Sequence, residues 1–184
     1  MKFILEYSKF INESKGYEHG CVMAHVPVEN WSQLTDQINL EDLYTEQGSD
    51  IYGIQKNPHL TLLYPITQNV DVSEIKSIID SIVNGNLCVK IEGIDLFEND
   101  NYDVVKFNVE CNDALQNLHS ELKSKIPNND RFEVYRPHIT IAYAKPGLGH
   151  KYIDPNYRYE FKNVNKIIYT RPNDTDLTIE LWEF

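Results

Sequence analysis

One seven-residue pattern occurs twice in this chain. Residues 58–64 read PHLTLLY and residues 137–143 read PHITIAY, so proline, histidine, threonine and tyrosine recur at the same internal spacing. A run of apolar residues that starts at a proline is typical of a β-strand, and both copies fit that description. A duplicated strand indicates a chain built from two related halves, each organised around one copy.

The two predicted strands determine where their polar side chains point. Side chains on a strand alternate between its two faces. His59 and Thr61 therefore share one face, whereas the apolar residues between them and Tyr64 are expected on the other, core-facing side. The second copy sorts in the same way, with His138 and Thr140 on the polar face. Side by side, the two strands would bring two imidazoles and two hydroxyls into one cleft.

This set of side chains suits proton transfer at a phosphodiester. One histidine can take the proton of the attacking oxygen while the other protonates the leaving oxygen, and each such group typically contributes about 10²–10⁴ in rate. The threonine hydroxyls can hold the phosphoryl oxygens. We predict His59, Thr61, His138 and Thr140 as catalytic residues, with activity that is bell-shaped in pH. Bound phosphate and acidic surroundings are expected to outweigh desolvation and raise the pKa of both imidazoles.

The sequence predicts no metal and no cofactor. It has no His-Glu-x-x-His and no Cys-x-x-Cys pattern, and neither motif strand carries a carboxylate beside its histidine. The glycines of Gly147-Leu148-Gly149 lack the lysine, hydroxyl and helix of a phosphate-cradling loop. Metal-independent acid–base chemistry is the interpretation that remains.

Two His-x-Thr motifs, each followed by an aromatic residue, resemble the two-histidine (2H) phosphoesterase superfamily over most of residues 19–184. The resemblance implies an α+β, bilobal fold, in which two pseudo-symmetric antiparallel sheets flank a central cleft with helices outside. The acidic composition and the start MKFILEY are most similar to phage members. The best known of these degrade the cyclic-oligonucleotide signals of CBASS immunity, so the resemblance implies cleavage of a cyclic oligonucleotide in the host cytoplasm.

Five further residues are candidate substrate contacts. Lys56 lies three residues before the first motif histidine and Arg136 two before the second, where each could offer charge to a phosphate. Tyr52, in an acidic and turn-rich loop, could stack on a base. Tyr64 and Tyr143 are the last residues of the two motifs and are also predicted as substrate contacts, although strict alternation places them on the core face.

The apolar spacing predicts helices and strands around the motifs. Helices are expected within residues 1–16, at 31–38, from the cap at Asp71 to residue 83, and after the cap at Asn112. Strands besides the motifs are expected at 20–27, 87–97, 102–109, 161–169 and 177–184, and the loop at 41–57 is interpreted as a lid or substrate-contacting segment. His25 and His119 are interpreted as structural. We expect residues 1–184 to form a single domain of two interleaved lobes, with 1–16 as an added N-terminal helix.

Composition restricts the partners and the compartment. A formal net charge of −11 disfavours a general binder of long nucleic acid but allows a short oligonucleotide in a cleft with a few local cations. No run approaches the roughly 18 apolar residues of a membrane span, and the start lacks a signal-peptide pattern. Cys21, Cys88 and Cys111 are far apart in apolar runs. They are expected to be buried free thiols in a reducing, cytoplasmic compartment.

Several functions remain open at this stage. The motifs favour a phosphodiesterase of a small oligonucleotide, but the same groups could open a 2′,3′-cyclic phosphate or cleave 2′–5′ oligoadenylate. A non-catalytic protein that sequesters such a nucleotide would use the same cleft, although it has no need of two titrating groups. A structural protein of a phage particle is suggested only by the N-terminal helix.

Overall fold

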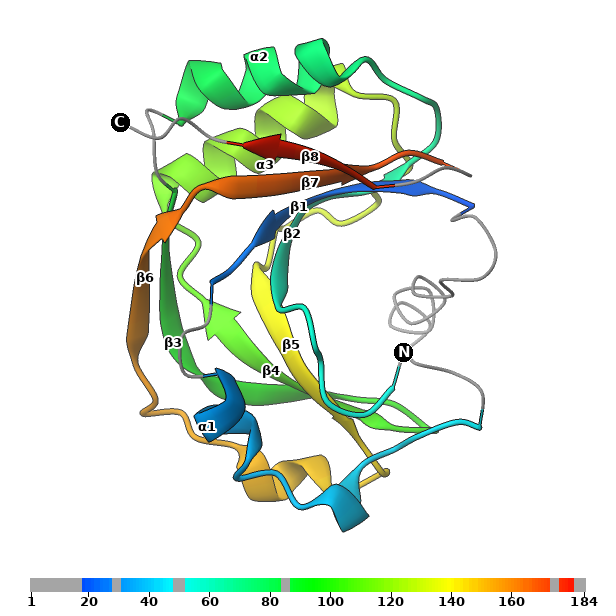
Figure 1. The fold of residues 1–184 in the computed structure, drawn as a ribbon, viewed down its shortest axis with the longest axis vertical. Coiled ribbons are helices and arrows are strands. Elements are labelled where there is room, and N and C mark those ends of the chain that lie inside the picture. Colours follow the sequence, from blue (N-terminus) through cyan, green and yellow to red (C-terminus); the bar gives the residue numbers. More distant parts are fainter. Residues whose placement is uncertain (1–17, 28–30, 48–51, 84–86, 173–175, 181–184) are drawn as a thin grey trace.

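The computed structural model describes residues 18–27, 31–47, 52–83, 87–172 and 176–180. Its strands form one antiparallel sheet in the order β6-β3-β4-β5-β2-β1-β7-β8. They are β1 Gly20–His25, β2 His59–Ile66, β3 Leu87–Glu98, β4 Asp103–Val109, β5 His138–Ala144, β6 Tyr159–Val164, β7 Lys166–Thr170 and β8 Asp176–Glu180. The sheet is strongly curved and carries its helices outside (Figure 1), which confirms the α+β class. The predicted helix within residues 1–16 lies outside the described residues.

The two motif strands, β2 and β5, are neighbours at the centre of the sheet. They pair where Leu60 lies opposite Ile139, and beyond this short contact they diverge. The end of β2 then pairs with residues 127–129, and the end of β5 pairs with segments 43–44 and 53–55. The segment before β2 thus pairs with the end of β5, and the segment before β5 pairs with the end of β2. The two four-stranded halves of the sheet, β6-β3-β4-β5 and β2-β1-β7-β8, are therefore related by a pseudo-two-fold axis. The loop expected to be a lid is, in its described parts, bonded to β5.

The curvature of the sheet follows from its connectivity. The run 161–169, predicted as a single strand, is two strands separated by Asn165. The first, β6, pairs with β3 at one end of the sheet, while β7 pairs with β1 in the opposite half. Consecutive Cα atoms lie only about 3.8 Å apart, so a one-residue connection requires these two parts of the sheet to approach each other. The strand-like run of residues 161–169 did not indicate that the chain changes its partner strand at Asn165.

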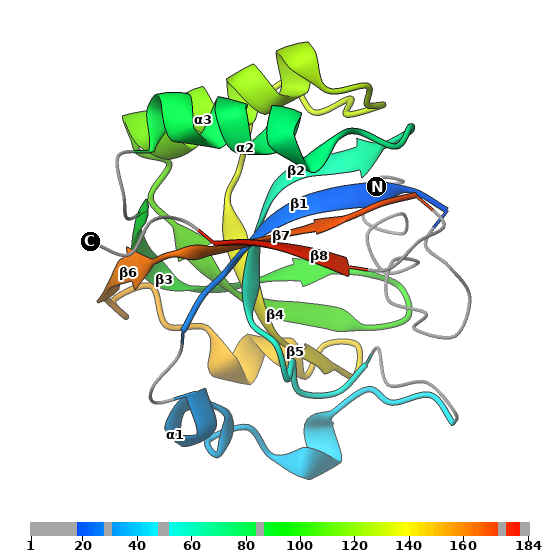
Figure 2. The same cartoon turned by 45° about the horizontal axis from the view of Figure 1, so that its top comes forward.

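The helices cover the outside of the sheet on two flanks. Helices α2 (Val72–Ile82) and α3 (Asp113–Lys125) lie side by side on one flank, and the short α1 (Trp31–Thr35) lies on the opposite flank (Figure 2). Both long helices begin at the predicted caps, because Asp71 Oδ1 accepts from Ser73 N and Asn112 Oδ1 from Leu115 N. Two one-turn 3-10 helices, η2 (Leu40–Asp42) and η3 (Gly149–Tyr152), lie near α1. In the part of the chain described above, no helix is long and apolar enough to cross a membrane.

The cysteine prediction was correct in part. Cys21, Cys88 and Cys111 form no disulfide, and the first two are half-buried. Cys111, however, is exposed, because it lies in the connection between β4 and α3 rather than inside a strand. The expectation of burial was therefore wrong for Cys111 and was met only in part at the half-buried Cys21 and Cys88.

Candidate active site

The polar faces of β2 and β5 meet where the two motif strands pair. With Leu60 opposite Ile139 in an antiparallel register, His59 comes beside Thr140 and Thr61 beside His138. Residues directly opposite on one face of an antiparallel pair have Cβ atoms about 4.5–5.5 Å apart. The two histidine–threonine pairs therefore form a compact set of four polar side chains, with the histidines on one diagonal.

Each histidine ring is oriented by the backbone just before it. His59 Nδ1 lies 2.9 Å from Asn57 O, and His138 Nδ1 lies 3.0 Å from Arg136 O, so both rings contact the carbonyl two residues upstream. A carbonyl oxygen only accepts, so Nδ1 carries the proton in this contact. In the neutral ring the lone pair is then on Nε2, the nitrogen that can exchange a proton with a ligand. The same ring tautomer is selected in both motifs.

The prolines of the motifs hold the ends of these strands in equivalent ways. Pro58 O accepts from Val26 N at 3.1 Å, and Pro137 O accepts from Val109 N, also at 3.1 Å. Each motif is thus bonded to the strand on its outer side, β1 or β4. The repeated sequence pattern is repeated as backbone geometry.

A β-bulge directly follows each motif threonine. Thr61 lies opposite Met23 and Leu63 opposite Val22, which leaves Leu62 as an extra residue in β2. A bulge inserts one residue into one strand and so reverses the alternation of side chains beyond it.

The bulge in β5 is equivalent, because Thr140 pairs with Lys106 and Ala142 with Val105. Tyr64 and Tyr143 therefore lie on the same face as the histidines and line the same cavity. The prediction that these tyrosines face the core was wrong, since strict alternation cannot anticipate an inserted residue.

A cavity of about 680 Å³ opens beside the histidine–threonine set. This volume lies within the range of about 300–1,000 Å³ that is usual for small-molecule sites. Its wall includes Thr61, His138 and Thr140, together with the loop of residues 130–136. The wall is rich in aromatic side chains: Tyr64, Phe97, Tyr102, Phe132, Tyr135 and Tyr143. Such a surface suits a ligand with flat apolar faces.

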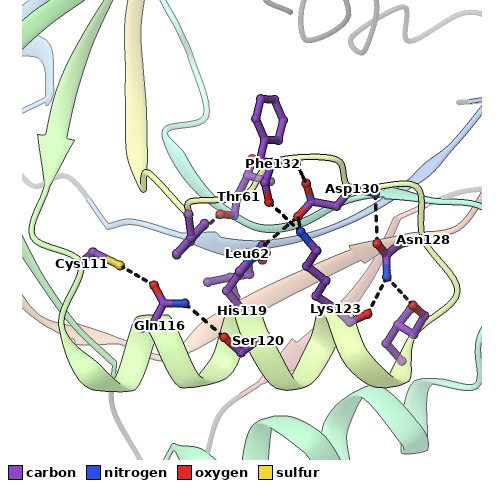
Figure 3. Close-up of polar contacts among 12 residues, drawn as sticks. Thr61, Leu62, Cys111, Gln116, His119, Ser120, Lys123, Asn128, Asp130 and Phe132 are labelled. Atoms are coloured by element: carbon purple, nitrogen blue, oxygen red, sulfur yellow. Dashed lines mark hydrogen bonds and ion pairs between the residues drawn. The ribbon is translucent and has the colours of Figure 1, made fainter.

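The loop 130–136 is held in place by a polar network from α3. Asp130, whose side chain is 3% exposed, lies 3.4 Å from His119 Nε2 and 3.3 Å from Lys123 Nζ. Its Oδ1 accepts from Phe132 N, and Lys123 Nζ donates to Phe132 O at 2.7 Å (Figure 3). These contacts fix the start of the loop against the helix.

The same network supports the bulge in β2. His119 Nδ1 lies 2.8 Å from Leu62 O, and the Tyr135 hydroxyl donates to Thr61 O at 2.7 Å. The rings of His119 and Tyr135 stack with centroids 4.2 Å apart. Buried carbonyls that leave a regular ladder need such partners. The structural interpretation of His119 thus fits its contacts.

Four tyrosines pack against one another, and two of them, Tyr102 and Tyr143, line the cavity. The ring of Tyr102 lies 5.2 Å from Tyr44, 5.3 Å from Tyr52 and 5.5 Å from Tyr143. The Tyr44 hydroxyl donates to Glu46 Oε1. The buried hydroxyl of Tyr102, by contrast, has no hydrogen-bond partner among the described residues.

Electrostatics distinguish the second motif histidine. The pKa of His138 is lowered to about 4, first by burial and then by the nearby positive charges of Lys106 and His59, while the contact with the Arg136 carbonyl opposes this shift. His138 is thus a neutral imidazole near pH 7. In the ligand-free protein desolvation therefore prevails at His138. The expected rise of the pKa concerns the complex with bound phosphate and stays a prediction.

The structure places the other predicted contact residues differently. Arg136, Tyr64 and Tyr143 line the cavity. Lys56 is exposed on the loop before β2, and Tyr52 is half-buried in the tyrosine cluster; neither is among the residues that line the cavity. His59 lies at the first position of β2 and is likewise not among the residues that line the cavity.

Several wall residues were missed by the sequence analysis. Phe97 and Tyr102 come from the β3–β4 hairpin, and Arg131, Phe132 and Tyr135 come from the loop before the second motif. The cluster of aromatic and arginine residues directly upstream of Pro137 was the available signal. Within the described ranges, no group of three His, Cys, Asp or Glu side chains is placed to hold a metal ion.

Solved structures share this fold over most of the chain. Usb1 from Kluyveromyces marxianus, in a structure with uridine monophosphate, is 11% identical with a TM-score of 0.57, covering 89% of this chain and 99% of that one. LigT from E. coli in its apo form is 14% identical with a TM-score of 0.51, covering 90% of this chain and 96% of that one. At these identities the likeness is one of fold.

The fold and its paired histidine motifs define a two-histidine phosphoesterase, an enzyme that acts on phosphodiesters. The family model of the 2′-5′ RNA ligase superfamily matches residues 24–155, a range that contains both motifs. The chain belongs to that superfamily. No curated protein sequence matches the chain significantly.

Proposed function

We propose that this protein is a metal-independent phosphodiesterase that cleaves a small oligonucleotide, with a cyclic oligonucleotide as its substrate. The observation that carries the proposal is the equivalent setting of the two histidines. Both lie on paired strands, beside a threonine, with Nδ1 on a backbone carbonyl, which places the lone pair of the neutral ring on Nε2. Two such groups are what general acid–base catalysis at one phosphorus requires.

The reaction is an internal transesterification. The 2′-hydroxyl of the ribose attacks the adjacent phosphorus, and one histidine Nε2 takes its proton. The bond from phosphorus to the leaving 5′-oxygen breaks, and the other histidine gives that oxygen a proton. The products are a 2′,3′-cyclic phosphate and a 5′-hydroxyl. The hydroxyls of Thr61 and Thr140 donate to the non-bridging oxygens as their charge rises.

Three observations support a small nucleotide as the substrate. The cavity has the size of a small-molecule site, and its aromatic wall can stack on bases while Arg131 and Arg136 offer charge to phosphates. The net charge of −11 disfavours a long nucleic acid. Usb1, which shares the fold, has been solved with uridine monophosphate.

The biological setting of the proposal is phage evasion of CBASS immunity in the host cytoplasm. It rests on the resemblance of the acidic chain to phage two-histidine phosphoesterases and on a cavity that can enclose a compact ligand. Degrading a cyclic-oligonucleotide signal would prevent activation of the host effector.

The test is a substrate panel with purified protein and excess EDTA. The panel holds 3′–5′ cyclic di- and trinucleotides, linear 2′–5′ oligoadenylate and 2′,3′-cyclic mononucleotides, with products separated by chromatography. We expect linear products from a cyclic oligonucleotide, and none from the His59→Ala/His138→Ala double variant. Turnover confined to 2′–5′ or 2′,3′-cyclic substrates would reassign the substrate. Tight binding without turnover would identify a sequestering protein instead.

A further inference from the structure

The two halves of the site have equivalent backbone geometry, but among the described residues only the β5 side has a buried lysine, Lys106. On the β5 side, Lys106 of β4 lies opposite Thr140, and Asn108 lies opposite His138. On the β2 side, the equivalent positions are Met23 of β1 opposite Thr61 and His25 of β1 opposite His59, with Lys166 of β7 opposite His25. A cation on one side is therefore replaced by an apolar side chain on the other.

Lys106 is held beside the second motif by three neighbours. Lys106 is only 3% exposed, and its Nζ lies 2.5 Å from Asn108 Oδ1 and 3.5 Å from Asp95 Oδ2. Nζ also lies 4.3 Å from the centre of the Phe97 ring, which in turn stands edge-on to His138 with centroids 5.1 Å apart. Lysine side chains are seldom buried so completely, so the burial of Lys106 calls for a functional or structural explanation.

The counter-ion of Lys106 compensates its charge incompletely. The Asp95 side chain is 50% exposed, and its 3.5 Å distance to Nζ is long for an ion pair. Water therefore screens the carboxylate more than the buried ammonium, so a net positive field acts on the adjacent ring. The charged or titratable groups that act at this corner are Lys106, Asp95, Arg136 and His59.

We propose that Lys106 makes the site electrostatically one-sided, so that His138 acts as the general base and His59 as the general acid. The proposal rests on the proposed function and adds the direction of proton flow. His138 Nε2 takes the proton of the attacking hydroxyl as the new oxygen–phosphorus bond forms. His59 Nε2 gives its proton to the leaving oxygen as the old bond breaks. Lys106 is a positioning residue in this scheme, because it acts through His138.

The position of Lys106 agrees with the titration of its neighbour. The pKa of His138 is lowered to about 4 by burial, with Lys106 next among the lowering causes and His59 after it. A ring kept neutral by burial and by a fixed cation is suited to accept a proton and unsuited to donate one at the start of the reaction.

The role of Lys106 is tested by Lys106→Met, which places there the residue type found at the equivalent position 23. We expect the acidic limb of the kcat/KM profile, and the titration of His138 followed by NMR, to move upward by about one pH unit. Lys106→Arg, which retains the charge, should restore both.

The matched control is Lys166→Met, because Lys166 lies opposite His25 and lowers its pKa. That variant should move the titration of His25 and leave His138 unchanged. An unmoved His138 in folded Lys106→Met overturns the role of Lys106.

The assignment of acid and base is tested with a substrate whose leaving group needs no proton. Uridine 3′-(4-nitrophenyl) phosphate has such a leaving group, whereas a uridine dinucleotide does not. His59→Ala should lose about 10²–10⁴ on the dinucleotide but stay within about tenfold of wild type on the nitrophenyl ester. His138→Ala should lose activity on both. The reverse pattern would overturn the assignment. A wild-type protein that is inactive on both uridine esters and on the cyclic oligonucleotides of the substrate panel would instead refute the proposed function.

Discussion

The hydroxyl of Tyr135 donates to the carbonyl of Thr61 at 2.7 Å, across 74 positions of the sequence. This bond joins the loop before the second motif to the bulge of the first one. The stacked ring of His119 supports it from the side of α3. This contact between the halves thus links the wall of the cavity to the backbone of Thr61.

Removing this bond should affect both stability and substrate binding. We expect Tyr135→Phe to lower the free energy of unfolding by about 0.5–1.5 kcal/mol and to raise KM more than it lowers kcat. Tyr44→Phe is the control, because its hydroxyl bonds to Glu46 and Tyr44 is not among the cavity-lining residues. Denaturant unfolding and steady-state kinetics measure both effects. Equal changes of KM in the two variants would contradict a specific role for the Tyr135 bond.

Loss of either motif histidine should remove most of the activity and leave the fold intact. We expect His59→Ala and His138→Ala each to lower turnover of the natural substrate by about 10²–10⁴. The double variant should lose little more than the worse single one, since the two rings act in one step. Single-turnover kinetics and circular dichroism provide the measurements. Near wild-type turnover in either single variant would disprove the acid–base assignment.

The neutral state of His138 predicts a pH dependence of stability. Its pKa is lowered to about 4 in the folded protein, against about 6.5 in an unfolded chain. Between these values the unfolded state binds more protons, so the free energy of unfolding should fall as pH drops from 7 to 5. The burial-lowered pKa of His25 contributes in the same direction. Urea unfolding at several pH values should show a smaller slope in His138→Gln than in wild type. Equal slopes would refute the contribution of His138.

A hydroxyl that lacks a partner should be dispensable for stability. The buried Tyr102 hydroxyl has none among the described residues, so Tyr102→Phe should leave thermal stability unchanged or raise it. Tyr169 is the matched contrast, because it is fully buried and its hydroxyl accepts from Val70 N at 3.0 Å. Tyr169→Phe should lower Tm by a few degrees. Calorimetry on the two variants separates the cases, and a destabilised Tyr102→Phe would show that its hydroxyl has a stabilising contact.

The sequence by itself determined the class of the fold and indicated the four residues of the candidate site. The duplicated motif predicted two strands and the shared face of each histidine–threonine pair, because the period of two in a strand is a local property. Helix caps at Asp71 and Asn112 were likewise predictable, since a cap bonds to residues only two or three positions away.

Tertiary structure alone decided what depends on partners distant in the chain. The bulges that bring Tyr64 and Tyr143 to the cavity exist only relative to β1 and β4. The division of residues 161–169 into two strands follows from pairing at two separate places in the sheet. The lowered pKa of His138 likewise arises from burial and from Lys106, which is 32 positions from His138 in sequence and beside it in space. Strand register, side-chain burial and the electrostatic field at a histidine ring all depend on residues that are close in space but distant in the chain. The local sequence pattern therefore does not predict them.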